Sequence, residues 1–132
     1  MSSILDEIWI FSKDGIPIVD FARIGGVDKS LLGSFISAIK VFVKEVSKGQ
    51  LKSLNVGNDK YTFTTCVQNE IILVCKSPLE VKDKRIQKIT KIIADIFDDM
   101  FSLEDINNWD GDVSFFDKFK DKVDLYFKMA DL

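Results

Sequence analysis

The chain has 132 residues, of which 46% are hydrophobic and 30% charged, and its net charge at pH 7 is -3. This length fits one domain over residues 1–132, and the composition is that of a folded domain that stays dissolved. The negative charge gives no general attraction to nucleic acid or to an anionic membrane, so neither is expected as a direct partner.

An opening hairpin is predicted at the N-terminus. Residues 5–11 read as a strand that is apolar on both faces, and Asp14-Gly15 supplies the chemistry of a turn before a returning strand at 16–21. Pro17 lacks the N–H that a central strand donates. The second strand is therefore expected at an edge of the sheet.

A helix is predicted over residues 29–48, capped by Asp28 and ended by Gly49. Its apolar residues form one broad stripe, and small, basic and isolated apolar residues form the opposite, outer side. That outer side carries Gly33, Ser37, Lys40, Val41 and Lys44. A glycine inside a helix costs about 1 kcal/mol relative to alanine, so a neighbouring backbone or a partner is expected to need the space at Gly33.

Three further strands are predicted at 51–56, 61–67 and 71–75, with turns at Gly57-Asn58-Asp59 and Gln68-Asn69. If the second turn forms, Cys66 pairs with Ile71 and Cys75 with Thr62, so the two thiols do not face each other and are expected to be free and buried. The run at 71–75 is apolar on both faces, as is the first strand. Both are expected at the centre of the sheet with helices above and below.

The last part of the chain is predicted to be mostly helical. The sequence Ser77-Pro78-Leu79-Glu80 has the form of a capping box, which predicts a long helix directly after it, with a narrow apolar stripe from Ile86 to Phe101. Residues 103–111 are expected to form a polar loop that carries Trp109. Residues 115–130 follow as a final amphipathic helix.

The charges of the long helix oppose its dipole, which favours acidic residues at the start and basic residues at the end. Basic residues gather toward its start, namely Lys82, Lys84, Arg85, Lys88 and Lys91, and acidic residues lie near or beyond its end, namely Asp95, Asp98, Asp99, Glu104 and Asp105. One interpretation is a solvated face with spaced ion pairs. The other is a polarised surface that selects a complementary partner.

The residues that most catalytic sites require are missing. Histidine is absent, which removes the commonest general base and the commonest zinc ligand, and two distant cysteines cannot form a zinc site. Gly25-Gly26 lacks the remainder of a phosphate-binding motif. In the loop 105–112, alignment on Gly111 puts Ile106 at the first ligand position of a calcium-binding EF-hand, which excludes that motif. We expect no catalytic residue, no cofactor and no metal.

The sequence resembles the longin domains, particularly the N-terminal one of the signal recognition particle receptor alpha subunit. The likeness is strongest from Leu5 to Val19, where Phe11-Ser12-Lys13-Asp14-Gly15 forms the turn, and it extends more loosely over nearly the whole chain. The resemblance implies an α+β fold of three layers, α/β/α, of the longin/profilin-like kind. The implied sheet has five antiparallel strands in the order 2-1-5-4-3, with one helix on one face and two on the other.

The resemblance also implies a non-catalytic interaction module of membrane trafficking or GTPase regulation. Such domains bind a small Ras-like GTPase or another longin or roadblock domain. Here the expected contact surface is the outer side of the first helix together with Leu54 in the adjoining third strand, which the implied order leaves at an edge. Homodimerisation through that edge is a linked alternative.

Two other hypotheses remain at this point. A small-molecule sensory domain of the profilin or PAS-like type would need a sizeable pocket beneath the helices. An enzyme would rest on scattered carboxylates alone. The sequence shows neither an apolar run of about 18 residues nor the basic start and cleavage site of a signal peptide, so a cytoplasmic protein is expected, in contact with membranes only through its partner.

Overall fold

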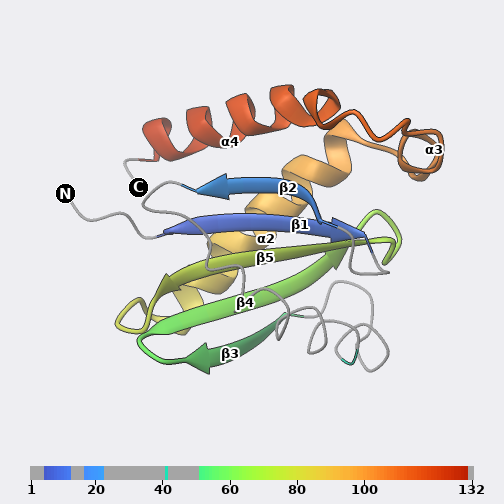
Figure 1. Ribbon diagram of the computed structural model, residues 1–132. Coiled ribbons are helices and arrows are strands. Elements are labelled where there is room, and N and C mark those ends of the chain that lie inside the picture. The colour runs from blue at the N-terminus through green and yellow to red at the C-terminus, as the bar shows by residue number, and fades with distance from the viewer. Residues whose placement is uncertain (1–4, 13–16, 23–40, 42–50, 131–132) are drawn as a thin grey trace.

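The computed structural model describes residues 5–12, 17–22, 41 and 51–130. One antiparallel sheet lies at its centre, with the strand order β2-β1-β5-β4-β3 (Figure 1). The strands are β1 (Glu7–Ser12), β2 (Pro17–Ala22), β3 (Lys52–Val56), β4 (Asp59–Cys66) and β5 (Ile71–Pro78). Side chains are described along four of these strands, and in β2 for Ile18 alone. The expectation of an α+β fold with an antiparallel sheet is confirmed.

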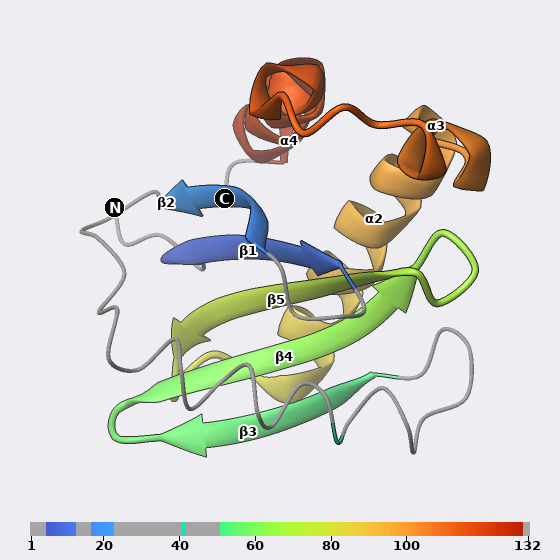
Figure 2. The same ribbon diagram turned by 45° about the vertical axis from the view of Figure 1, so that its right-hand side comes forward.

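The helices that the structure describes come after the sheet in the sequence. They are α2 (Asp83–Met100), α3 (Leu103–Asn107), the 3-10 helix η1 (Val113–Phe116) and α4 (Asp117–Met129). In Figure 2, α2 runs behind the sheet and α4 lies above its β2 edge, and buried side chains of both helices belong to one cluster with Ile8 and Ile10 of β1. The helix predicted over 29–48 lies outside the described residues, except for Val41, which is helical. The expected layer on the other face therefore stays a prediction.

The positions of the strands follow from their sequences. β2 lies at one edge, as Pro17 predicts, and the two strands that are apolar on both faces, β1 and β5, lie inside the sheet. The predicted turn after β4 also sets the predicted register, because Cys66 pairs with Ile71 and Thr62 with Cys75. Both cysteines are free and buried.

The inner strands of the sheet are buried on both faces. The face toward α2 carries Ile8, Ile10 and Leu73, which are fully buried together with Ile86 and Ile93 of the helix. Side chains on the opposite face are buried as well, including Trp9, Phe11, Tyr61 and Val74. Burial on this scale is the main source of the stability of the fold.

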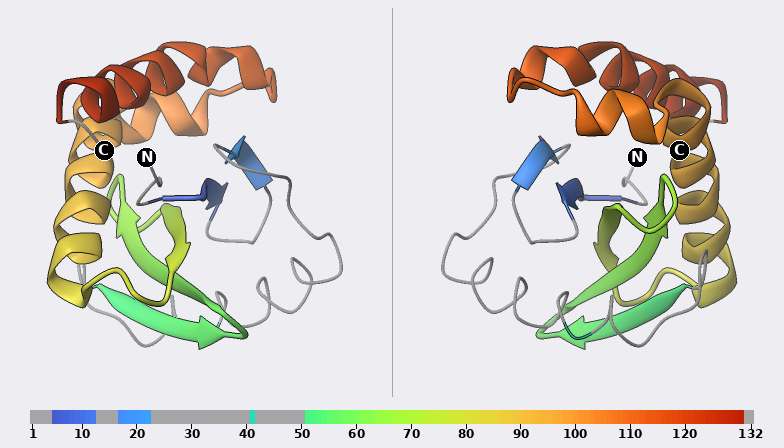
Figure 3. Two further views of the ribbon diagram at one scale, coloured as in Figure 1. Left: turned by 90° about the vertical axis from the view of Figure 1, so that its left-hand side faces the viewer. Right: turned by 90° about the vertical axis from the view of Figure 1, so that its right-hand side faces the viewer.

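An aromatic cluster joins α2 to the C-terminal helices. The ring of Phe97 lies 4.7 Å from that of Phe101, 5.1 Å from Phe119 and 5.9 Å from Phe116, measured between centroids. Phe97, Phe116 and Phe119 are fully buried. These contacts hold α4 against the upper part of α2 (Figure 3).

The predicted capping box at Ser77 is wrong. Ser77 and Pro78 belong to β5, where they pair with Lys60 and Asp59, and α2 begins only at Asp83 after the N-cap residue Lys82, which makes no side-chain cap. The long strand β4 supplies partners as far as Asp59, so the sheet ladder extends β5 through the segment in which local pattern favours a helix start. Tertiary pairing overrides the local signal here.

The residues predicted as a polar loop contain the short helix α3. A true capping box begins it: the Ser102 side chain accepts from the N–H of Asp105 at 3.1 Å, and the Asp105 carboxylate accepts from the N–H of Ser102 at 2.9 Å. Aspartate stands where the usual motif has glutamate or glutamine. That substitution conceals the signal in the sequence.

Candidate interaction surfaces

The strand β3 forms an exposed edge of the sheet. It pairs with β4 on one side, and no described strand pairs with its other side. Its first four residues are exposed. The hairpin to β4 closes through Gly57-Asn58, where Gly57 has a φ of 61°, a value that glycine adopts without strain and that suits the first position of a tight hairpin turn.

The hairpin register indicates which backbone groups face outward. Val56 and Asp59 form the pair that closes the turn, and antiparallel pairs alternate between those that exchange hydrogen bonds and those that do not. The pair of Val56 and Asp59 exchanges hydrogen bonds, so two residues further along β3 Leu54 also directs its N–H and C=O groups toward β4. Ser53 and Asn55 lie between these positions, so their N–H and C=O groups point away from β4. A row of backbone donors and acceptors in this position is suited to pairing with another chain.

Of the residues predicted for partner binding, the structure describes two. Leu54 is 42% exposed and Val41 is 56% exposed, both large apolar side chains left in contact with water. Leu54 pairs with Tyr61, so it projects from the face of the sheet opposite α2. The others, Gly33, Ser37, Lys40 and Lys44, lie outside the described residues, so the predicted surface as a whole stays a prediction.

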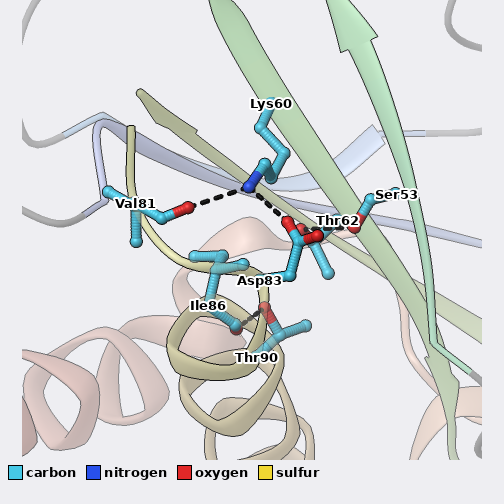
Figure 4. Close-up of polar contacts among 7 residues, drawn as sticks. All are labelled: Ser53, Lys60, Thr62, Val81, Asp83, Ile86 and Thr90. Carbon is cyan, nitrogen blue, oxygen red and sulfur yellow. Dashed lines mark hydrogen bonds and ion pairs between the residues drawn. The ribbon is translucent and has the colours of Figure 1, made fainter. Parts of the chain in front are cut away.

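A polar contact fixes the start of α2 against the sheet (Figure 4). The ammonium of Lys60, a buried residue of β4, donates to the carbonyl oxygen of Val81 at 2.8 Å and forms an ion pair with Asp83. The Thr90 hydroxyl donates to the carbonyl oxygen of Ile86 at 2.7 Å within the same helix. Next to β3, the hydroxyls of Ser53 and Thr62 lie 3.2 Å apart. Of these contacts, those of Lys60 join the β3–β4 hairpin to the start of α2, and the other two lie within the helix and within the hairpin.

A second polar contact lies at the far end of α2. The Asp98 carboxylate accepts from the backbone N–H of Val67 at 2.6 Å, at the turn where Val67, Gln68 and Asn69 all have positive φ. The neighbouring hollow of about 330 Å³ is lined by this turn, Asp98 and the start of α3. It lies beside the turn, not beneath the helices where a sensory pocket was expected. Asp98 thus stabilises a turn, which sequence reasoning did not anticipate.

An apolar groove of about 380 Å³ lies between α2 and the end of α4. It is lined by Ile96, Lys122, Leu125, Tyr126, Met129 and Ala130. Leu125 is 54% exposed and Met129 is 79% exposed. Partial burial raises the pKa of the Tyr126 phenol. Sequence reasoning missed this groove, although Leu125 and Met129, four residues apart and outside the buried stripe of the final helix, were the signal that could have indicated it.

The titratable groups that the structure describes do not form a catalytic arrangement. Burial raises the pKa of the Cys66 thiol well above its ordinary value and that of Cys75 to about 12, which disfavours the reactive thiolate. Within the described ranges, no three carboxylates or thiols come together in a way that could hold a metal. Asp105 and Asp112, from the loop considered for calcium, instead accept hydrogen bonds from the backbone of Ser102 and Ser114.

No protein-family model matches this sequence, and a search among curated proteins finds no match. Solved structures similar to the chain include MglB of Myxococcus xanthus, which is 14% identical in sequence. The match covers 72% of this chain and 85% of that one, with a TM-score of 0.49. A likeness at this level identifies neither a family nor a function. None of the helices within the described ranges has the length and apolarity needed to cross a bilayer.

Proposed function

We propose that this chain is a longin-like, non-catalytic interaction domain that binds a small Ras-like GTPase or another longin or roadblock domain. The contact surface is the outer edge of β3 with Leu54, together with the outer side of the first helix, to which Val41 belongs. The setting is membrane trafficking or GTPase regulation in the cytoplasm. The exposed edge of β3 is the observation that carries the proposal.

Two physical features support this edge as the contact. First, the outward backbone groups of Ser53 and Asn55 can extend the sheet with a strand from a partner, which supplies affinity through main-chain hydrogen bonds. Second, Leu54 and Val41 offer apolar surface that gains free energy when a partner covers it. The edge has little protection: β3 contains no proline, and its sequence KSLNV has one charged residue, Lys52.

Binding to the host's Ras-like GTPases, each loaded with GTP or with GDP, tests the proposal directly. We expect one of them to bind the wild-type chain, and Leu54→Asp to weaken binding at least tenfold, because a carboxylate at the contact loses apolar burial and requires desolvation. Leu79→Asp is the matched control, since Leu79 is 37% exposed and lies outside β3. A chain that binds no GTPase, longin or roadblock domain would refute the proposal.

Proline substitutions in β3 separate pairing through the backbone from contact through side chains. Asn55→Pro removes an N–H that faces outward, so it should block strand addition while the β3–β4 ladder survives. Leu54→Pro removes an N–H that faces β4 and should instead destabilise the hairpin. If Asn55→Pro binds the partner like the wild type, the contact does not use the edge. Homodimerisation through this edge, the linked alternative, would be lost in the same variant.

A further inference from the structure

The exposed side of α2 changes its charge at the middle of the helix. Lys84, Lys88 and Lys91 are followed by Asp95 and Asp99 at spacings of three and four residues, which places all five on one side. All are exposed. Within the stripe, the Lys91 ammonium and the Asp95 carboxylate form an ion pair at 3.9 Å. Because the two side chains are 67% and 60% exposed, this ion pair stabilises the helix little.

Helix stability does not account for this pattern, which we call the α2 stripe. Of the stripe residues, Lys84 lies in the first turn and Asp99 in the last, where each interacts unfavourably with the helix dipole. Asp98 has a role within the fold because it accepts from Val67, but the stripe carboxylates of Asp95 and Asp99 lie on the exposed side. An arrangement that costs stability and faces solvent indicates a binding role.

The α2 stripe is complementary to itself when it is turned end for end. If the twofold axis crosses the exposed side of α2 at the level of Ile93 along the helix, Lys91 comes opposite the partner's Asp95, and Lys88 comes opposite the partner's Asp99. A twofold interface places the same patch of both molecules in contact, so each such pair occurs twice. A partner of a single charge sign would match only half of the stripe, and an anionic membrane would repel its acidic half.

The groove between α2 and α4 lies beside the stripe and supplies the apolar part of the contact. Ile96 connects the two, because it follows Asp95 on α2 and lines the groove with Leu125 and Met129. Ion pairs in water contribute orientation more than affinity, whereas covering these exposed apolar side chains contributes affinity. In Figure 3 no described element lies over the outer side of α2, and the groove residues Leu125 and Met129 are exposed.

We propose that the α2 stripe and the adjoining groove bind a second copy of this chain, with the two α2 helices antiparallel. This dimer leaves the β3 edge free, so it is independent of the proposed function. Its formation would present two β3 edges on one particle.

The mass in solution, measured by sedimentation or light scattering over a range of concentrations, is the first test. We expect twice the monomer mass at low salt and a shift toward monomer as the salt is raised from about 0.05 M to 0.5 M, because added salt screens the ion pairs. Leu125→Asp should also shift the wild-type dimer toward monomer. A chain that stays monomeric at every concentration and salt level would overturn the proposal.

Charge reversal gives the sharper test. Lys88→Glu with Lys91→Glu makes the stripe acidic throughout, and Asp95→Lys with Asp99→Lys makes it basic throughout, so each double variant should be monomeric by itself. An equal mixture of the two should dimerise again, because opposite stripes now meet. All four reversed residues are exposed, and the like-charge neighbours that each double variant creates along the helix destabilise it only slightly, so the fold should survive, as circular dichroism will show.

The controls carry the same changes in charge on α4, outside the groove lining. They are Lys120→Glu with Lys128→Glu, and Asp121→Lys with Asp124→Lys. Both should dimerise like the wild type, as should Asn55→Pro in β3. The proposal would be overturned if either charge-reversed stripe variant formed dimers by itself, or if an equal mixture of the two did not form dimers. A dimer lost only in Asn55→Pro would overturn it as well and would assign the contact to the β3 edge.

Discussion

At the scale of single residues, Cys75 shows how completely the centre of the sheet is closed to water. It is fully buried in β5. Burial raises the pKa of its thiol from 9.0 to about 12, although a hydrogen bond with Thr90 acts in the opposite direction. The folded protein therefore keeps this proton over a range of pH in which the unfolded chain loses it.

This difference predicts that the protein becomes less stable at alkaline pH. The thiol contributes its full share below pH 9 and loses it as the pH rises toward 12, because only the unfolded state ionises in between. At pH 10 the loss from Cys75 should be on the order of 1 kcal/mol. Urea unfolding measured at pH 7.5 and at pH 10 gives the free energy of unfolding at each pH. This free energy should fall less between the two pH values for Cys75→Ala than for the wild type. Equal drops would mean that the thiol is accessible to water in the folded state.

At the scale of the elements, Lys60 connects the sheet to the start of α2. Its ammonium serves two acceptors, the Val81 carbonyl and the Asp83 carboxylate, and the Asp83 side chain is 69% exposed. Loss of the lysine leaves both the Val81 carbonyl and the Asp83 carboxylate without this donor, whereas loss of the aspartate leaves the ammonium its bond to the Val81 carbonyl. Solvent screening reduces the contribution of the ion pair itself.

A double-mutant cycle with Lys60→Met and Asp83→Asn measures this arrangement. We expect Lys60→Met to cost about 1 to 3 kcal/mol of unfolding free energy, since the partly buried Val81 carbonyl loses its charged donor. Asp83→Asn should cost less than 1 kcal/mol, and the coupling between the two should be about 0.5 kcal/mol. Chemical denaturation provides all four values. A larger cost for Asp83→Asn would show that the ion pair, not the carbonyl contact, holds the helix start.

Sequence reasoning succeeded where local chemistry and the sheet agree. Pro17 indicated an edge strand, and the turn at Gln68-Asn69 fixed the register of Cys66 and Cys75 correctly. It failed at Ser77, where pairing with Lys60 extends β5 through a segment with the local signature of a helix start. Contacts between segments far apart in the sequence decide such positions, and local periodicity does not report them.

The candidate surfaces were harder to predict than the fold. Leu54 could be placed on an edge strand because the family resemblance implied the strand order. Leu125 and Met129 could be picked out as apolar residues outside the buried stripe of the final helix, but the groove that they line also depends on how α4 packs on α2, which their spacing does not give. The hydrogen bond from Val67 to Asp98 likewise joins residues that only the folded chain brings together.

At the scale of the whole molecule, the aromatic cluster around Phe97 joins α2, η1 and α4. We expect Phe97→Ala to destabilise the protein by about 3 to 5 kcal/mol, because the ring is fully buried and its removal leaves a cavity among three other rings. Phe115→Ala, a change of the same type at a residue that is 43% exposed, should cost about 1 kcal/mol. Thermal unfolding measured by circular dichroism compares the two. Equal costs would show that the cluster is not the packing centre of this half of the molecule.

The strand order also has a consequence for the time course of folding. β1 pairs with β2, its neighbour in the sequence, but its other partner is β5, which begins at Ile71, roughly 60 residues after β1 ends. At a synthesis rate of about 5 to 20 residues per second, the ribosome needs several seconds to deliver that strand. During this interval the edge of β1 that will pair with β5 has no partner strand, and Trp9 and Phe11 are not yet enclosed. The newborn chain therefore cannot close its sheet before β5 emerges, and the face that carries Ile8 and Ile10 stays uncovered until α2 follows.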